Sequence, residues 1–169
     1  ASDKFKNTKE INRLRKYRNN YINDYLHKTS KSVIDKAIEN NVGNIVIGKL
    51  KYIKQDMNYN KSFVQIPTQR LVELITYKAK LQGIEIKLQE ESYTSGCSAI
   101  DLEPITKKYY NKSRRITRGL FKSGYGILNA DINGSLNILR KSEKCIPDLV
   151  NTMRDKGNWT HPQRIRVAY

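Results

Sequence analysis

Apolar residues in the first quarter of the chain recur at the spacing of an amphipathic helix. Between residues 8 and 39 they follow one another at steps of three and four, and Lys, Arg and Asn fill the opposite face. The pattern predicts one long helix of roughly 45–50 Å at ~1.5 Å per residue. Thr29-Ser30 is a candidate break, and the Asn-Asn-Val-Gly sequence at residues 40–43 ends the helix.

Two strand patterns flank a second helix pattern. Residues 44–48 form a continuous apolar run that suits a strand buried on both faces, and residues 84–88 alternate strictly between apolar and polar side chains. Residues 67–82 between them have helical periodicity, with Pro67 in the first turn and Gly83 just past the end. This order predicts a βαβ unit whose two strands are adjacent and parallel.

The second half of the chain has a weaker pattern. Residues 92–123 are polar and aromatic with several glycines, which predicts irregular structure. Residues 125–129 suit a brief extended segment, and the apolar spacing that follows predicts a helix to about residue 141. Residues 49–66 show no clear period, and we expect the tail at residues 143–169 to be mostly loop.

Charge narrows the classes of partner. The 169 residues include 32 Lys and Arg against 16 Asp and Glu, a net charge of +16, and nucleic acid is the commonest polyanion in a cell. No apolar run approaches the ~18–20 residues of a membrane span, and no signal-peptide pattern is present. We therefore expect a soluble, cytoplasmic, nucleic-acid-associated protein with no membrane partner.

Cysteine and histidine are too few for two common kinds of site. Cys97 and Cys145 cannot build a disulfide framework, and they cannot supply an all-cysteine zinc ribbon. His27 and His161 are the two histidines. We therefore expect no zinc, and we expect His27 to be an ordinary helix residue rather than a catalyst.

Two acidic residues follow the second predicted strand. Glu90 and Glu91 lie where ligands gather in open α/β sheets, just beyond the carboxyl ends of parallel strands. The alternative is a solvated acid pair at the exit of a strand, because acids in loops are ordinary residues. The residues alone leave both interpretations open.

A second candidate begins the last predicted helix. Oxygen-bearing side chains recur at Asp131, Asn133, Ser135 and Asn137, and Mg²⁺ prefers such hard oxygen ligands. The alternative is that Asp131 or Asn129 simply caps the helix by accepting hydrogen bonds from its first amides.

A third candidate is a basic stretch between residues 104 and 130, which contains no acid. Arg guanidinium groups bind phosphate through paired hydrogen bonds, so the stretch favours phosphate binding over the alternative of a solvated cationic loop. Its candidate nucleic-acid-binding residues are Lys107, Lys108, Lys112, Arg114, Arg115, Arg118 and Lys122.

A series of short motifs occurs in a characteristic order over about residues 20–142. They lie at residues 45–48, 54–55, 63–67, 77–79, 83–84, 91–95, 114–121 and 129–141. The series resembles the C-terminal half of the TnpB (OrfB) proteins of insertion sequences, which are similar to the type V CRISPR effectors.

The resemblance implies an α/β fold with an RNase H-like (RuvC) core that uses three acids. Asp131 matches the last acid. Gly48 stands where many members have a Glu, and members with this Gly place the Glu at the position of Glu91. The first acid belongs to opening strands with a Gly-Ile-Asp-like motif, which this sequence lacks. We therefore expect an incomplete core, and a further part of the protein or a partner chain that supplies this Asp.

The resemblance also implies a domain plan and a function. We expect an N-terminal helical segment at residues 1–43, a nuclease core at residues 44–142 with a basic insertion at 92–124, and a tail at 143–169. The implied activity is Mg²⁺-dependent DNA cleavage directed by a guide RNA, with Glu91 and Asp131 as metal ligands, although this chain alone should not cut. The alternatives are a nuclease-dead RNA- or DNA-binding module of the same fold and a basic RNA-associated protein unrelated to nucleases.

Overall fold

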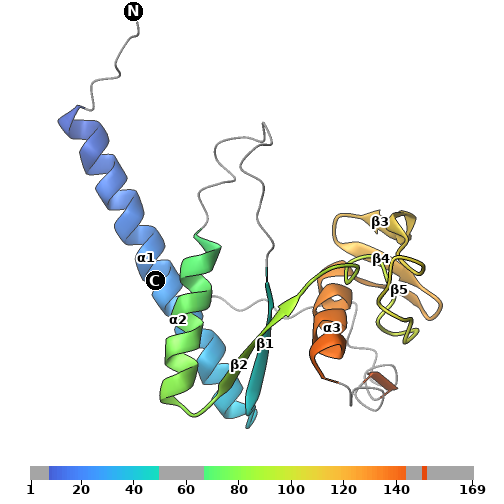
Figure 1. Ribbon diagram of the computed structural model, residues 1–169. Coiled ribbons are helices and arrows are strands. Elements are labelled where there is room, and N and C mark those ends of the chain that lie inside the picture. The colour runs from blue at the N-terminus through green and yellow to red at the C-terminus, as the bar shows by residue number, and fades with distance from the viewer. Residues whose placement is uncertain (1–7, 50–66, 144–149, 152–169) are drawn as a thin grey trace, which may run out of the picture. The chain divides into compact units, whose positions relative to one another are not determined.

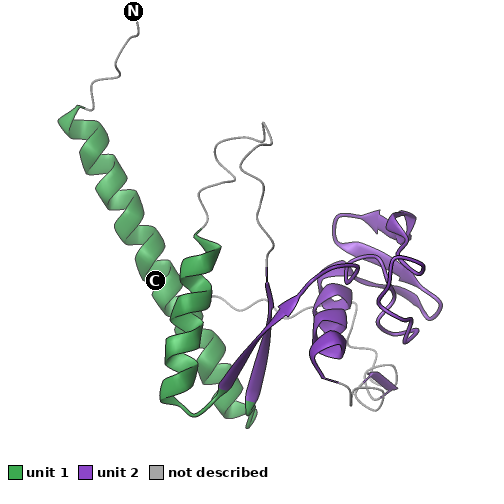
Figure 2. Cartoon of the chain, viewed as in Figure 1, with its two compact units in different colours: residues 1–43, 61–84, 166–169 green, residues 44–60, 85–165 purple. Residues whose placement is uncertain are grey.

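The computed structural model describes residues 8–49, 67–143 and 150–151 (Figure 1). The chain divides into two compact units (Figure 2). Unit 1 comprises residues 1–43, 61–84 and 166–169, and unit 2 comprises residues 44–60 and 85–165. Among the described residues, no helix is long and apolar enough to cross a membrane.

Helix α1 (Lys9–Glu39) begins unit 1 and confirms the long amphipathic helix. The Thr8 hydroxyl caps it by accepting a hydrogen bond from the Ile11 amide at 3.3 Å. The candidate break at Thr29-Ser30 is absent, because the helix runs through this pair. The buried Ser30 hydroxyl donates to the His27 carbonyl of the same helix at 3.0 Å, so its polar group is satisfied without a break.

Helix α2 (Thr68–Leu81) packs beside the C-terminal half of α1 within unit 1. Both helices contribute small and aliphatic side chains to the buried seam. They are Leu26, Ser30, Ile34, Ala37, Leu74, Ile75 and Ala79. The Lys78 ammonium group crosses the seam and donates to the His27 carbonyl at 2.6 Å and the Ser30 hydroxyl at 2.8 Å. Desolvation by burial lowers the pKa of Lys78.

The expected boundaries of α2 are confirmed. Pro67 occupies the N-cap position and Gln82 the C-cap position, and Gly83 follows with a φ of +72°. This left-handed conformation suits glycine, which has no Cβ to clash with the backbone.

Two parallel strands, β1 (Asn44–Lys49) and β2 (Glu85–Glu90), confirm the predicted strand pair in unit 2. Their register places Ile45 opposite Ile86 and Gly48 opposite Gln89. The expectation of full burial on both faces is wrong for residues 45–47, which are half-buried. Helix α3 (Ala130–Ser142) packs against both strands and places its first turn in the same unit.

A small antiparallel sheet occupies much of the segment that we expected to be irregular. It consists of β3 (Arg115–Thr117), β4 (Leu120–Ser123) and β5 (Gly126–Asn129), and a short 3₁₀ helix, η2 (Lys112–Arg114), leads into it. Only β5 agrees with the extended segment that the sequence predicts. Two strands escaped prediction because three or four residues are too few to show a clear alternation.

The small sheet has one buried and one exposed face. Phe121 and Leu128 lie opposite each other and form a core cluster with Ile100 and Ala130. The neighbouring residue Lys122 is exposed on the other face. This sheet therefore covers an apolar core with one face and exposes both cationic and apolar side chains, such as Lys122 and Ile127, on the other.

The expected domain plan stays a prediction. The expected boundary at residue 43 is also where the first segment of unit 1 ends, and α2 groups with α1. The predictions for residues 50–66 and for most of the tail lie outside the described residues. The described elements are a mixture of helices and small sheets, which confirms the α/β class at this level.

Candidate metal centre and nucleic-acid interface

Glu91 follows directly after β2, and its side chain reaches back over the end of β1. The Thr94 amide and hydroxyl both donate to the Glu91 carbonyl, at 3.2 and 2.7 Å, so a tight turn fixes the backbone here. A Cβ built on Gly48 would lie 2.7 Å from Cδ and 2.9 Å from Cγ of Glu91, with Oε1 nearer still. The carboxylate of Glu91 therefore lies at the carboxyl end of β1.

Glu90 has a different environment from Glu91. Its carboxylate accepts from the Lys141 ammonium group at 2.7 Å and from the Ser92 hydroxyl at 2.5 Å, which ties the end of β2 to α3. In residues 8–49, 67–143 and 150–151, the Glu91 carboxylate has no hydrogen bond or ion pair. Of the two acids, Glu90 is thus engaged in packing the fold, and Glu91 is available for a ligand.

Asp131 lies in the first turn of α3 with an exposed side chain. The cap of this helix is Asn129, whose Oδ1 accepts from the Asp131 amide at 2.9 Å and the Ile132 amide at 3.1 Å. The capping interpretation is therefore correct for Asn129 and wrong for Asp131. The Asp131 carboxylate makes no hydrogen bond or ion pair with the described part of the chain.

Three other candidate oxygen ligands of this segment serve the fold. Asn133 and Asn137 are fully buried, and both donate to the Cys97 carbonyl, at 2.9 and 2.8 Å. The Ser135 hydroxyl donates to the Asp131 carbonyl at 3.0 Å within the helix. The interpretation of these three as metal ligands is corrected, because their polar atoms already bond the backbone.

The remaining candidates for a metal centre are Glu91 and Asp131. They belong to elements that pack together in unit 2, since α3 contacts both β1 and β2. The described residues contain no group of three or more His, Cys, Asp or Glu side chains that could hold a metal ion. Mg²⁺ in phosphate-processing sites takes one or two carboxylates besides water and substrate oxygens, so this pair has suitable chemistry.

Cys97 is part of the core. It is fully buried, and its Sγ lies 3.7 Å from the Thr106 carbonyl, to which it donates. Burial raises the pKa of the Cys97 thiol. The thiol is therefore protonated at neutral pH, which is the wrong form for a metal ligand.

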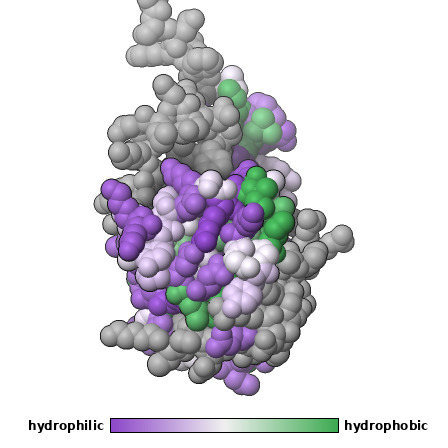
Figure 3. Space-filling view, turned by 90° about the vertical axis from the view of Figure 1, so that its right-hand side faces the viewer, coloured by the Kyte–Doolittle hydropathy of each residue, from purple (hydrophilic) through white to green (hydrophobic). Residues whose placement is uncertain are grey.

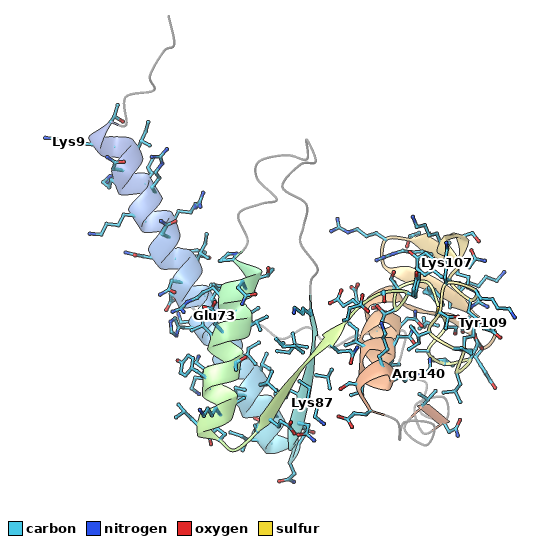
Figure 4. All side chains as sticks on the ribbon, in the orientation of Figure 1. Lys9, Glu73, Lys87, Lys107, Tyr109 and Arg140 are labelled. Carbon is cyan, nitrogen blue, oxygen red and sulfur yellow. The ribbon has the colours of Figure 1, made fainter. Side chains whose placement is uncertain are left out.

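One cation of the basic stretch has an acidic partner. The Arg114 guanidinium donates to both oxygens of Glu103 at 2.6 and 2.7 Å, and both side chains are largely buried. The expectation that these cations lack a paired acid is thus wrong for Arg114. Sequence reasoning missed Glu103 because it stands one residue before the acid-free stretch. Arg140, which is labelled in Figure 4, also holds this loop by donating to the Glu103 carbonyl at 3.0 Å.

The other cations of the stretch are exposed. Arg115 donates to the Arg118 carbonyl at 2.6 and 3.1 Å, which holds the connection between β3 and β4. Within the described residues, four cations of this stretch have no hydrogen bond, ion pair or ring contact through their side chains: Lys107, Lys112, Arg118 and Lys122. We call these four the free cations.

Aromatic and apolar side chains accompany the exposed cations. The Lys108 ammonium group lies 5.7 Å from the ring centroid of the exposed Tyr109. Ile127 is exposed and pairs with Lys122 on the outer face of the small sheet. Figure 3 shows a mainly hydrophilic face with small hydrophobic areas between. Cations interleaved with aromatic groups suit the binding of phosphates and bases.

The comparisons with known proteins agree with the sequence motifs. Residues 69–138 match the family model described as "Cas12f1-like, TNB domain", a segment that includes both Glu91 and Asp131. No curated protein sequence matches the chain.

A solved structure has a similar fold. It is Cas12f1 in a complex with sgRNA and target DNA, and it superimposes with a TM-score of 0.63 at 24% sequence identity. The match covers 80% of this chain and 37% of the Cas12f1 chain. The resemblance of this chain to TnpB-related type V effectors is thereby confirmed.

Proposed function

We propose that the chain is the RuvC-like nuclease part of an RNA-guided DNA endonuclease. The proposal starts from the match to the Cas12f1-like family model and from the similarity of the fold to Cas12f1. Its proposed reaction is metal-dependent hydrolysis of a DNA phosphodiester bond. Its proposed partners are a guide RNA, target DNA, and a further polypeptide segment that supplies the first catalytic Asp.

The observation that carries this proposal is the placement of two carboxylates without described partners. Glu91 lies over the end of β1, and Asp131 lies exposed on α3, which packs against the same strand pair. The neighbouring Glu90 carboxylate, by contrast, pairs with Lys141. Two carboxylates that no described protein group engages can coordinate a cation from solution.

Glu91 and Asp131 would bind Mg²⁺ through their carboxylate oxygens. The remaining coordination positions would be available to water and to phosphate oxygens. When bound, the metal supplies Lewis-acid polarisation of the phosphodiester and an activated water. The chain's own contribution is positional: the turn at Thr94 fixes Glu91, and the Asn129 cap leaves the Asp131 carboxylate unengaged. This part of the proposal is tested by comparing DNA cleavage by the unaltered protein with cleavage by the Glu91→Gln and Asp131→Asn variants, which lack the carboxylate charge.

A second candidate function is that of a nuclease-dead RNA- or DNA-binding module. The free cations on the loops and outer face of unit 2 favour it, because nucleic-acid binding needs no third carboxylate. Both candidates share the same binding surface. Cleavage that depends on Asp131 separates them.

Replacing three of the free cations should weaken binding to nucleic acid, because the phosphate contacts that they make are lost. We expect the triple variant Lys107→Gln, Lys112→Gln and Lys122→Gln to reduce the slope of log affinity against log salt by about 2–3, since each phosphate contact contributes ~0.7–0.9. Affinity should fall by a similar factor for unrelated sequences. The measurement is fluorescence anisotropy of labelled single-stranded DNA over a range of NaCl concentrations.

Three cations that are already paired provide the matched control. Lys31, Lys36 and Arg70 form ion pairs with acids on their own helices in unit 1, and replacing all three with Gln removes the same charge. This control variant should keep the slope nearly unchanged. Equal slopes for the test variant and the unaltered chain would place the binding surface elsewhere.

A further inference from the structure

We propose that Gly48 is a positioning residue for the Glu91 carboxylate, because the missing side chain at residue 48 leaves the space that the carboxylate occupies. The inference rests on the proposed function, in which Glu91 binds the metal. It assigns a role to a residue that carries no functional group of its own.

The steric observation concerns a single neighbour. A Cβ at residue 48 would lie within 3.0 Å of three heavy atoms, and all three belong to the Glu91 side chain. Real Cβ atoms do not approach other heavy atoms so closely. Any residue other than glycine would therefore displace the carboxylate from the end of β1.

Backbone conformation does not explain glycine at this position. Gly83 and Gly126 have φ angles of +72° and +118°, which other residues rarely adopt, whereas Gly48 lies outside the positive-φ region. Glycine inside a strand weakens it and often marks a close approach of another group. At Gly48 that group is the Glu91 carboxylate.

The sheet register explains why Glu91 reaches this point. Gly48 lies opposite Gln89 in β2, and Glu91 comes two residues after Gln89, directly past the end of the strand. A long side chain can reach its diagonal neighbour across a strand pair. The absence of a side chain at Gly48 thus allows the Glu91 carboxylate, which follows β2, to lie over the end of β1.

The decisive variant is Gly48→Ala in the full 169-residue chain. The three nearest atoms belong to one flexible side chain and none to the backbone, so we expect the midpoint of urea unfolding to be equal or higher. Labelling of carboxylates with carbodiimide and glycine ethyl ester, followed by mass spectrometry, should show a changed rate at Glu91 and an unchanged rate at Glu90. The affinity for Mn²⁺ alone should fall about 10–100-fold, the scale seen when the support of a metal ligand is lost.

The control variant is Gly43→Ala. A Cβ at Gly43 meets nothing within 4 Å, so neither the labelling of Glu91 nor the Mn²⁺ affinity should change. A double variant adds a second check. In a Glu91→Gln background, Gly48→Ala should have no further effect on Mn²⁺ affinity, because the group that it displaces no longer carries charge.

The outcomes separate this inference from the proposed function. An unchanged labelling rate at Glu91 in Gly48→Ala overturns the positioning role. A changed rate with unchanged Mn²⁺ affinity upholds the positioning role and overturns Glu91 as a metal ligand. Gly48→Ala could also lower the Mn²⁺ affinity by the same factor with and without Glu91→Gln. Gly48 would then act through another group, and the inference would be overturned.

Discussion

Asp131→Asn should lower DNA cleavage by more than ~10²-fold, the scale on which loss of one charge-stabilising group acts. The assay uses a polypeptide that contains this chain together with the segment that supplies the first catalytic Asp, in Mg²⁺ and in EDTA. Asparagine keeps the size of the side chain and suits the start of a helix, but it lacks the charge that a Mg²⁺ site requires. Folding and DNA binding should therefore remain nearly unchanged. Glu91→Gln should have the same effect, for the same reason.

Glu90→Gln provides the matched control at the neighbouring position. Glu90 already pairs with Lys141, so its loss should cost some stability and have a much smaller effect on cleavage. Cleavage that survives Asp131→Asn, or that depends on Glu90 more than on Glu91, would contradict the proposed site.

The second large effect concerns the stability of unit 2. Asn133→Leu and Asn137→Leu should each lower the free energy of unfolding by about 2–4 kcal/mol, since each leaves a buried backbone group unpaired. The Ala99 amide, which donates to Asn133 at 2.9 Å, would be left unpaired in the first variant. The Thr94 carbonyl, which accepts from Asn137 at 2.9 Å, would be left unpaired in the second.

The two substitutions should also be coupled. Both side chains donate to the Cys97 carbonyl, so either single variant leaves it one donor and the double variant leaves it none. We expect the double variant to lose more stability than the sum of the two. Urea unfolding followed by circular dichroism measures all three variants against Ser135→Ala, an exposed position where the change should stay within about 0.5 kcal/mol. Strict additivity would show that the Cys97 carbonyl is not the shared partner.

Sequence pattern was sufficient where one periodicity ran for many residues. The length of α1, the limits of α2 between Pro67 and Gly83, and the parallel pairing of β1 with β2 were all predicted. Each depends on local signals that do not require knowledge of the environment. The short β3 and β4 carried no such signal.

Residue type alone could not separate ligands from structural groups. Asn133 and Asn137 resemble oxygen ligands in the sequence, but burial against the Cys97 backbone gives them another role. Arg114 resembles a free phosphate-binding cation, but the fold brings Glu103 to it. The family resemblance links Gly48 to Glu91, but only the fold shows that the Glu91 side chain occupies the space above Gly48. These distinctions depend on contacts between residues that are distant in the sequence, and the spacing of residues along the chain does not predict such contacts.

The central claim is that Glu91 and Asp131 bind one metal centre together. The most direct measurement is a titration of the ¹⁵N-labelled 169-residue chain with substoichiometric Mn²⁺, a paramagnetic ion with the carboxylate preference of Mg²⁺. The amide signals of Gly48, Glu91 and Asp131 should broaden together, recover in excess Mg²⁺, and stay sharp in the Asp131→Asn variant. Broadening at only one of the two carboxylates, or evenly over exposed acids such as Glu10 and Glu73, would contradict the claim.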